Sequence, residues 1–277
     1  MKIFRKKVVL IWDFDGPVGL INSSLPYNFN YLNFENEIAN LRNILKILDQ
    51  FDVKCCFAIT GFSAEEGLFP YSFPELVKEI HARGHEVASH SWRHEWIPLF
   101  EKKQVAKSLE RSKIALEKAI ENRQEIVGFV PPHNRPMTWL RRGAFSLGDR
   151  RMFPFSRTGD NEYLIELLKI QGYKWVRVSY HNTFQKLGFA KSNVTGRIFD
   201  YKGILLLENH HTGFGEKVTR HILETNFPTY TLSAHPLMFS FENKKENKKN
   251  LLYTLEYLHN SNQDIEFVRP IDLLGED

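Results

Sequence analysis

The sequence is poor in cysteine. Its 277 residues contain two, Cys55 and Cys56, and these are adjacent. Neighbouring side chains on a strand point to opposite faces, so we expect no disulfide bond between them. The absence of a disulfide framework favours a reducing compartment.

Long hydrophobic runs are also missing. The basic N-terminus is followed by an apolar run, Val8–Trp12, that stops at Asp13. A signal-peptide core needs about 7–15 apolar residues and a membrane span about 20. We therefore expect a cytoplasmic protein without a transmembrane segment.

Charge of one sign is only in slight excess, with 37 basic and 33 acidic residues and a net charge of +4. The basic residues are spread along the chain and form no stripe of the kind that binds nucleic acid, so we expect no nucleic-acid partner. The fractions of hydrophobic residues (42%) and charged residues (25%) are those of a globular protein and exclude a disordered or collagen-like chain. No linker or repeat is visible, which predicts one domain over residues 1–277.

Strand-like and helix-like segments alternate along the chain. The predicted strands are 7–12, 53–59, 86–89, 126–130, 174–179, 203–207, 229–234 and 265–268. The predicted helices are 36–50, 73–83, 102–121, 161–171 and 249–259. This order indicates βαβ units and a mostly parallel α/β sheet, either doubly wound or closed into a barrel. The polar stretch Glu242–Asn250 is predicted to be a solvated, charged loop.

Two carboxylates follow the first predicted strand. Asp13 and Asp15 are two residues apart, so their side chains share a face of the strand. The carboxyl ends of parallel strands are where α/β folds carry their chemistry. The alternative is that Asp15 only caps the turn at Gly16-Pro17 and that Asp13 is solvated. The motif resembles the first motif of two families, the haloacid-dehalogenase-type phosphatases and the polysaccharide deacetylases (NodB homology).

The 11 histidines include a spaced pair, His90 and His94, which we expect on one face of a helical turn. With one carboxylate they would form a three-ligand metal site with an open position, as in catalytic zinc sites. Their segment, Gly84-His-Glu-Val-Ala-Ser-His-Ser-Trp-Arg-His94, resembles the deacetylase motif Gly-His-Glu-apolar-x-x-His-(Ser/Thr)-x-x-His. The phosphatase alternative has no counterpart to this segment and lacks a downstream acidic pair, so it is disfavoured.

Weaker motifs follow in the same order. Gly128-Phe-Val-Pro-Pro-His-Asn-Arg135 occupies the place of the third deacetylase motif, and Thr231-Leu-Ser-Ala-His-Pro236 resembles the last one. The resemblance runs from about residue 7 to residue 273 and implies a single distorted (β/α)7 barrel. It also implies a metal-dependent hydrolase that removes an N-acetyl or N-formyl group from a substrate containing an amino sugar.

The resemblance further implies roles for individual residues. Asp15, His90 and His94 would bind a divalent metal, with zinc favoured and Co²⁺, Ni²⁺, Mn²⁺ or Fe²⁺ left open. Asp13 would act as the general base on a water that the metal activates, and His235 as the general acid on the leaving amine.

Two positions depart from the family pattern. The third-motif arginine, which orients the base, is replaced by Val130, so either Arg135 takes its place or the base is held differently. No acidic partner for His235 is visible in the usual fourth-motif place, residues 178–181. His133 and Arg135 are candidate substrate-binding residues.

Two other functions stay open. The pattern Asp-x-Asp, present here as Asp13-Phe-Asp15, also occurs in the peptidoglycan- and imide-acting branches of the family. An amidohydrolase that acts on cyclic imides or ureides is therefore also consistent with the sequence. The missing arginine also fits a non-catalytic barrel that binds glycan. Among the remaining residues, we expect His85 to be structural and Trp92 and Trp96 to pack in the core. His210-His211 fit either the barrel mouth or a surface loop.

Overall fold

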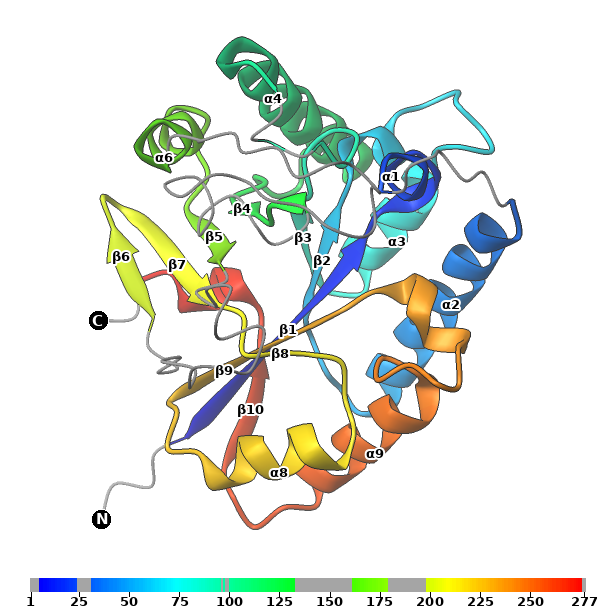
Figure 1. Ribbon diagram of the computed structural model, residues 1–277, viewed down its shortest axis with the longest axis vertical. Coiled ribbons are helices and arrows are strands. Elements are labelled where there is room, and N and C mark those ends of the chain that lie inside the picture. Colours follow the sequence, from blue (N-terminus) through cyan, green and yellow to red (C-terminus); the bar gives the residue numbers. More distant parts are fainter. Residues whose placement is uncertain are drawn as a thin grey trace, which may run out of the picture.

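The computed structural model in Figure 1 describes residues 5–23, 31–95, 97, 100–132, 161–178 and 198–275. Its strands are β1 (Lys6–Phe14), β2 (Cys56–Ile59), β3 (Glu86–Ser89), β4 (Gly128–Phe129), β5 (Trp175–Val178), β6 (Phe199–Tyr201), β7 (Ile204–Glu208), β8 (His211–Thr212), β9 (Thr229–Ala234) and β10 (Ile265–Val268). Its helices are α1 (Gly16–Asn22), α2 (Tyr31–Gln50), α3 (Pro74–Ala82), α4 (Lys102–Ala119), α6 (Asn161–Ile170), α8 (Glu216–Glu224) and α9 (Lys248–His259). Short 3-10 helices are η1 (Gly61–Ala64), η4 (Pro236–Ser240) and η5 (Pro270–Leu273).

The strands form a single curled sheet in the order β6-β7-β5-β4-β3-β2-β1-β9-β8, and β10 also pairs with β1. Only the β6–β7 pair is antiparallel among the described strands. Helices surround the curled sheet in Figure 1. The predicted α/β barrel is confirmed, and it is distorted in that no pairing joins β6 or β7 to β8 within the described residues.

The two faces of the sheet have separate cores because strand side chains alternate. Val8, Leu10 and Trp12 of β1 point outward into the cluster shared with the helices, whereas Val9 and Ile11 point into the barrel. The two cysteines behave in the same way. Cys55 belongs to the outer cluster and Cys56 to the inner one, and both are buried and free, as predicted.

Trp175 is completely buried in the barrel interior. Its ring lies so close to Gly128 that a Cβ atom there would be 2.2 Å from Trp175 Cζ2. The indole Nε1–H donates to Glu86 Oε1 (2.7 Å), and the backbone N–H of Ile271 donates to Glu86 Oε2 (2.8 Å). Burial raises the pKa of Glu86 to about 7, although both hydrogen bonds oppose the rise. Glu86 therefore ties the C-terminal segment to the barrel interior.

Each predicted helix and strand is present, with its ends shifted by a few residues. The largest change is in α2, which begins at Tyr31 rather than at residue 36. Among the α-helices and strands of the described residues, four were missed: α1, β6, β8 and α8. Gly16-Pro17 indicated only a turn, but Pro17 lies in the first turn of α1, where proline is tolerated. The strands β6 and β8 have three and two residues, too few to show a pattern.

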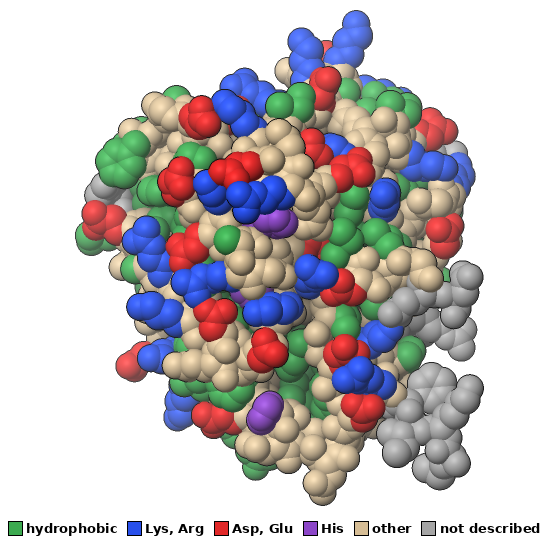
Figure 2. Space-filling view, turned by 180° about the vertical axis from the view of Figure 1, so that it is seen from behind, with side chains coloured by type: hydrophobic (Ala, Val, Ile, Leu, Met, Phe, Trp, Pro, Cys, Tyr) green, Lys and Arg blue, Asp and Glu red, His purple; other side chains and the backbone are tan. Residues whose placement is uncertain are grey.

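The surface mixes both signs of charge. Figure 2 shows Lys and Arg side chains interspersed with Asp and Glu over the rear face of the molecule. The net charge of +4 is thus not gathered into one patch on this face. None of the helices in the described residues has the length and apolar character needed to span a membrane.

Glu86→Gln is expected to change how stability depends on pH. The pKa of Glu86 is about 7 in the folded protein and 4.5 as its ordinary value, so the folded state binds this proton more tightly. Glu86 therefore makes the wild type lose stability as the pH rises from about 4.5 to 7. The wild-type minus variant difference in free energy of unfolding should fall by on the order of 3 kcal/mol over this range, measured by urea titration.

The comparison of wild type with variant is needed because His85 titrates in an overlapping pH range and changes the free energy of unfolding in the opposite direction. Burial lowers the pKa of His85 to about 4 in the folded protein. A difference that stays constant between pH 4.5 and 7 would contradict the role given to Glu86.

Candidate metal centre and catalytic residues

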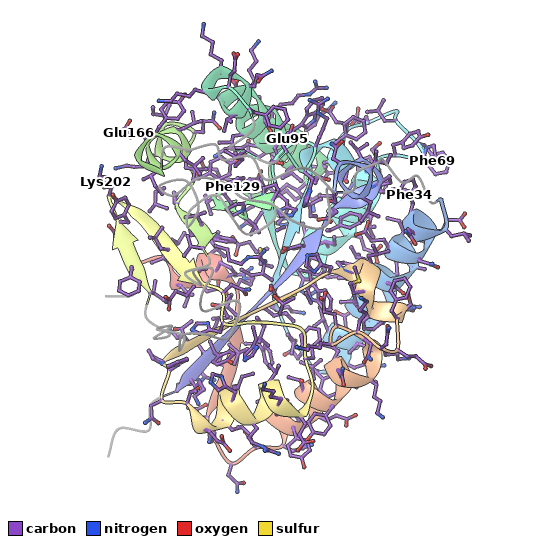
Figure 3. The ribbon with its side chains drawn as sticks, viewed as in Figure 1. Phe34, Phe69, Glu95, Phe129, Glu166 and Lys202 are labelled. Atoms are coloured by element: carbon purple, nitrogen blue, oxygen red, sulfur yellow. The ribbon has the colours of Figure 1, made fainter. Side chains whose placement is uncertain are left out.

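The candidate site lies where the carboxyl ends of the parallel strands meet. The pairing of Ile11 with Ser233 and of Trp12 with Ala234 brings the end of β1 beside the end of β9. Asp13 ends up beside His235 for this reason. His90 directly follows β3, in the loop that also contains Glu95, which is labelled in Figure 3.

Asp15, His90 and His94 form a compact three-ligand group. One possible ligand atom from each residue lies within 4.8 Å of the others, and all three residues are buried. Asp15 Oδ1 is 3.4 Å from Nε2 of His90 and 3.4 Å from Nε2 of His94. The three residues predicted to hold a metal are thus brought together, and among the described residues no other such group is found.

The two imidazoles meet through a turn and not through the predicted helical turn. Ser91 and His94 have φ angles of 62° and 59°, in the left-handed region, so the chain after β3 folds back on itself. Gly61 N–H and Ser112 Oγ–H both donate to the carbonyl oxygen of Ser91 (2.9 and 3.0 Å) and hold this turn in place. The rings of His90 and His94 lie 4.8 Å apart. The spacing was informative, but the expected conformation was wrong.

Hydrogen bonds orient both rings. His90 Nδ1 lies 2.7 Å from the carbonyl oxygen of Val130, which can only accept, so the proton is on Nδ1. The other ring nitrogen of His90, Nε2, faces Asp15. His94 Nδ1 is 3.0 Å from Ser23 Oγ, which leaves its Nε2 facing the same carboxylate. Partners of this kind on the outer nitrogen are what fix metal-binding histidines.

Asp15 has the character of a cation ligand. Burial alone would raise the pKa of its carboxyl group, but the His94 and His90 imidazoles outweigh burial and hold it well below its usual range. Within the described residues, its buried Oδ1 has no hydrogen-bond partner. A buried carboxylate oxygen of this kind, facing two imidazole nitrogens, fits the donor set of a divalent metal.

Asp13 is clamped by an arginine from the far side of the barrel. Arg177 of β5 donates from Nη1 to Asp13 Oδ1 (2.7 Å) and from Nη2 to Asp13 Oδ2 (2.5 Å). Both residues are almost completely buried. Burial by itself would raise the pKa of Asp13, but the guanidinium charge and its two hydrogen bonds lower it. Asp13 is therefore held ionised in one orientation.

His235 lies between two carboxylates. Its Nε2 is 3.7 Å from Asp13 Oδ2, and its Nδ1 is 3.0 Å from Glu246 Oε2, which also accepts the backbone N–H of His235. Burial would lower the pKa of His235. The hydrogen bond to Glu246 and the charges of Asp13, Glu246 and Asp15 instead raise it to about 9. The imidazole is consequently protonated at neutral pH.

Comparison with known proteins points to one family. The polysaccharide deacetylase family model matches residues 22–148, a range that includes His90 and His94. Over this part of the chain, the sequence is similar to the polysaccharide deacetylases. No curated protein sequence matches it significantly.

Solved structures support the barrel fold of this chain. A Mycobacterium smegmatis protein assigned to the polysaccharide deacetylases is 15% identical over 98% of this chain and 90% of its own, with a TM-score of 0.67. An allantoinase (Puue) is 14% identical over 98% of this chain and 90% of its own, with a TM-score of 0.63. A CE4 family pseudoenzyme from Bacillus anthracis is 13% identical over 95% of this chain and 64% of its own, with a TM-score of 0.53. The fold therefore occurs with and without activity, so function must be argued from the site.

Two residues of the site were missed in the sequence. Arg177 binds Asp13 as the third-motif arginine was expected to do, but it comes from a different strand. The feature that could have revealed it in the sequence is a single arginine within the apolar strand Trp-Val-Arg-Val. Glu246 is the acidic partner that His235 lacked in sequence. It lies in the stretch expected to be wholly solvated, and that expectation was wrong at this residue, whose side chain is 13% exposed.

Other predicted residues have different outcomes. His133, Arg135 and Trp96 lie outside the described residues, as do positions 179–181. His85 is buried and its Nδ1 accepts the backbone N–H of Cys55 (3.3 Å), which agrees with a structural role. Trp92 is half-buried beneath the Arg111 guanidinium (3.6 Å to the ring centroid) and not in the core.

The adjacent histidines His210 and His211 are packed rather than free on a loop. His210 stacks on Tyr230 with ring centroids 4.7 Å apart, and its Nδ1 accepts the backbone N–H of Thr231 (2.8 Å). His211 begins β8 and lies at a right angle to the ring of His221. Both histidines therefore pack around β8 and β9.

His90→Ala is expected to weaken zinc binding by at least about 100-fold, because changes to residues that only support a ligand already cost about 10–100-fold. Binding is measured by calorimetric titration of the metal-free chain. His259→Ala, which removes an exposed histidine of α9, serves as the control. Unchanged stoichiometry and affinity in His90→Ala would show that the ligand assignment is wrong.

Proposed function

We propose that this chain is a metal-dependent N-deacetylase that hydrolyses the acetamido (or formamido) group of an amino sugar. The observation that carries the proposal is the grouping of a metal-ligand set, an ionised carboxylate and a protonated imidazole at one rim of the barrel. Amide hydrolysis requires all three functions, because the carbonyl must be polarised, a water must be deprotonated and the amine must be protonated before it leaves.

Asp15, His90 and His94 would hold the divalent metal. Bound there, zinc or a similar cation would supply a Lewis acid for the amide carbonyl and lower the pKa of water. The nitrogen-rich donor set favours zinc. The Val130 carbonyl and Ser23 hydroxyl keep the two imidazoles aimed at the site, so little reorganisation accompanies binding.

Asp13 is the proposed general base. Arg177 occupies both of its carboxylate oxygens and fixes its plane, so a water at the neighbouring metal site would meet the same oxygen in each turnover. The charge of Arg177 also ensures that Asp13 is ionised at neutral pH. The lowered pKa makes Asp13 a weaker base. A lowered pKa of the attacking water would offset this.

His235 is the proposed general acid. Its Nε2 faces the Asp13 side of the site, and the Glu246 carboxylate holds Nδ1 in the protonated form. The ring is thereby oriented to give the Nε2 proton to the departing amine. Asp13 and His235 lie next to each other. The proton that Asp13 accepts from water can therefore replace the proton that His235 gives to the amine, within one catalytic cycle.

Asp13→Asn is expected to lower kcat by about 10²–10⁴-fold, because it removes the base while keeping the size of the side chain. The assay measures acetate released from N-acetylglucosamine oligomers by the zinc-loaded chain. Asp264→Asn, which removes an exposed carboxylate paired with Arg5, is the matched control. Zinc affinity should remain within a few-fold of the wild type in both variants.

The same assay separates the alternative functions. Opening of hydantoin or allantoin without acetate release would replace the proposal by an amidohydrolase of cyclic imides or ureides. Stoichiometric zinc binding with neither reaction would favour a non-catalytic barrel. The choice of sugar, and the cytoplasmic location expected from the sequence, stay predictions.

Glu246→Gln is expected to move the alkaline limb of kcat/KM to lower pH. The carboxylate charge helps to raise the pKa of His235, and glutamine keeps an acceptor oxygen but removes that charge. His235 should then lose its proton at lower pH. Glu216→Gln, at an exposed position of α8, should leave the limb in place. An unchanged limb in Glu246→Gln would mean that His235 is not the acid.

A further inference from the structure

A buried carboxylate beside the candidate metal centre has no part in the proposed mechanism. Glu37 lies on α2 and is 1% exposed. Neither of its carboxylate oxygens has a hydrogen-bond partner among the described residues. By contrast, the buried carboxylates of Asp13, Glu86 and Glu95 each accept hydrogen bonds from described groups. A carboxylate without a partner is costly to bury, so the presence of Glu37 calls for an explanation.

Helix α2 brings Glu37 to the place where the ends of β1 and β9 meet. The helix packs against α1, which begins directly after Asp15, and against η4, which begins at Pro236. Asn40, three residues after Glu37 and on the same face of α2, donates from Nδ2 to the carbonyl oxygen of Pro236 (2.9 Å). Phe34, which is labelled in Figure 3, lies three residues before Glu37 on the same helix. The position of Glu37 is therefore fixed from both sides.

The groups that act on the Glu37 carboxyl belong to the candidate site. Burial raises the pKa of Glu37 well above its usual range, and the charge of Asp15 adds to this rise. The charge of His235 and the nearby backbone N–H groups of Gly16 and Asp15 oppose the rise without reversing it. Glu37 thus lies near both the metal ligand Asp15 and the proposed acid His235, in a place with too little positive charge for a carboxylate.

The charges of the candidate site do not balance when a divalent cation is added. The charged groups assigned to the site are three carboxylates and two cations, namely Asp13, Asp15 and Glu246 with Arg177 and His235. With neutral histidine ligands, these groups leave one negative charge in excess. A divalent cation would change this to one positive charge in excess, which is costly where water is excluded. One further carboxylate near Asp15 would cancel it, and Glu37 is a buried carboxylate in that place.

We propose that Glu37 is a positioning residue for the divalent cation, whose charge it balances, and that it thereby raises the affinity of the site for the metal. Glu37 does not belong to the group of ligand atoms that lie within 4.8 Å of one another, so it acts through its charge and not as a ligand. The inference rests on the metal site of the proposed function, but it does not depend on the deacetylase reaction.

The test compares Glu37→Gln with Glu35→Gln by calorimetric titration of the metal-free full chain with Zn²⁺. Glutamine keeps the size of the side chain and removes its charge. Zinc binding should therefore weaken about 10–100-fold, as is found for residues that support metal ligands. Glu35 is exposed and lies two residues away on the same helix. Its replacement removes the same charge, but solvent screens this position, so the Kd should stay within about twofold.

A second measurement separates this role from a structural one. In urea titrations of the metal-free chains, Glu37→Gln should unfold at the same or a higher urea concentration than the wild type, because the lost carboxylate has no partner. Glu37→Met keeps the length of the side chain without a polar end group that must be paired. It should also unfold no earlier than the wild type and bind zinc at least about tenfold more weakly.

The proposal is overturned if Glu37→Gln binds zinc as tightly as the wild type, or if Glu35→Gln weakens binding equally. It is also overturned if both Glu37 variants unfold at lower urea concentrations than the wild type, which would assign a structural role. Failure of the deacetylase reaction gives a different result, namely absent acetate release with a zinc affinity that still depends on Glu37. Unchanged zinc binding in both His90→Ala and Glu37→Gln would overturn the metal site and this proposal together.

Discussion

Buried charge is the constraint on which the rest of this structure depends. Asp13, Asp15 and Arg177 are withdrawn from water at the barrel rim, and isolated charges there would be too costly to keep. Asp13 is paired with Arg177, and Asp15 faces the imidazoles of His90 and His94. Removal of one member of a buried pair costs about 3–5 kcal/mol, so the elements that carry these groups must stay in register.

The fold meets this constraint through strand register. Parallel strands bring their carboxyl ends to one edge, and the pairing of β1 with β9 sets Asp13 beside His235. Arg177 reaches Asp13 from β5, across the barrel interior, because odd and even residues of a strand face opposite sides. The same alternation that separates Cys55 from Cys56 therefore assembles the site. Side chains on the outer face of the sheet pack against the helices, and side chains on the inner face include Asp13 and Arg177 of the site.

Much of this was visible in the sequence. The alternation of apolar strands and amphipathic helices predicted the α/β sheet, and Asp13, Asp15, His90, His94 and His235 were identified as site residues. The positions that were missed depend on long-range contacts. Arg177 is 164 residues away from Asp13 along the chain, and Glu246 lies in a run of charged residues that looks solvated. The His90–His94 turn also depends on tertiary contacts, since Gly61 and Ser112 hold it.

The sequence by itself determined which residue types stand at the strand ends, and with them the resemblance to the polysaccharide deacetylases and the candidate metal-ligand set. Only the tertiary structure decided which cation neutralises Asp13 and which carboxylate is paired with His235. The physical reason is that local periodicity and spacing report which side of a strand or helix is buried. The pairing of buried charges instead follows from the register of strands far apart in the chain.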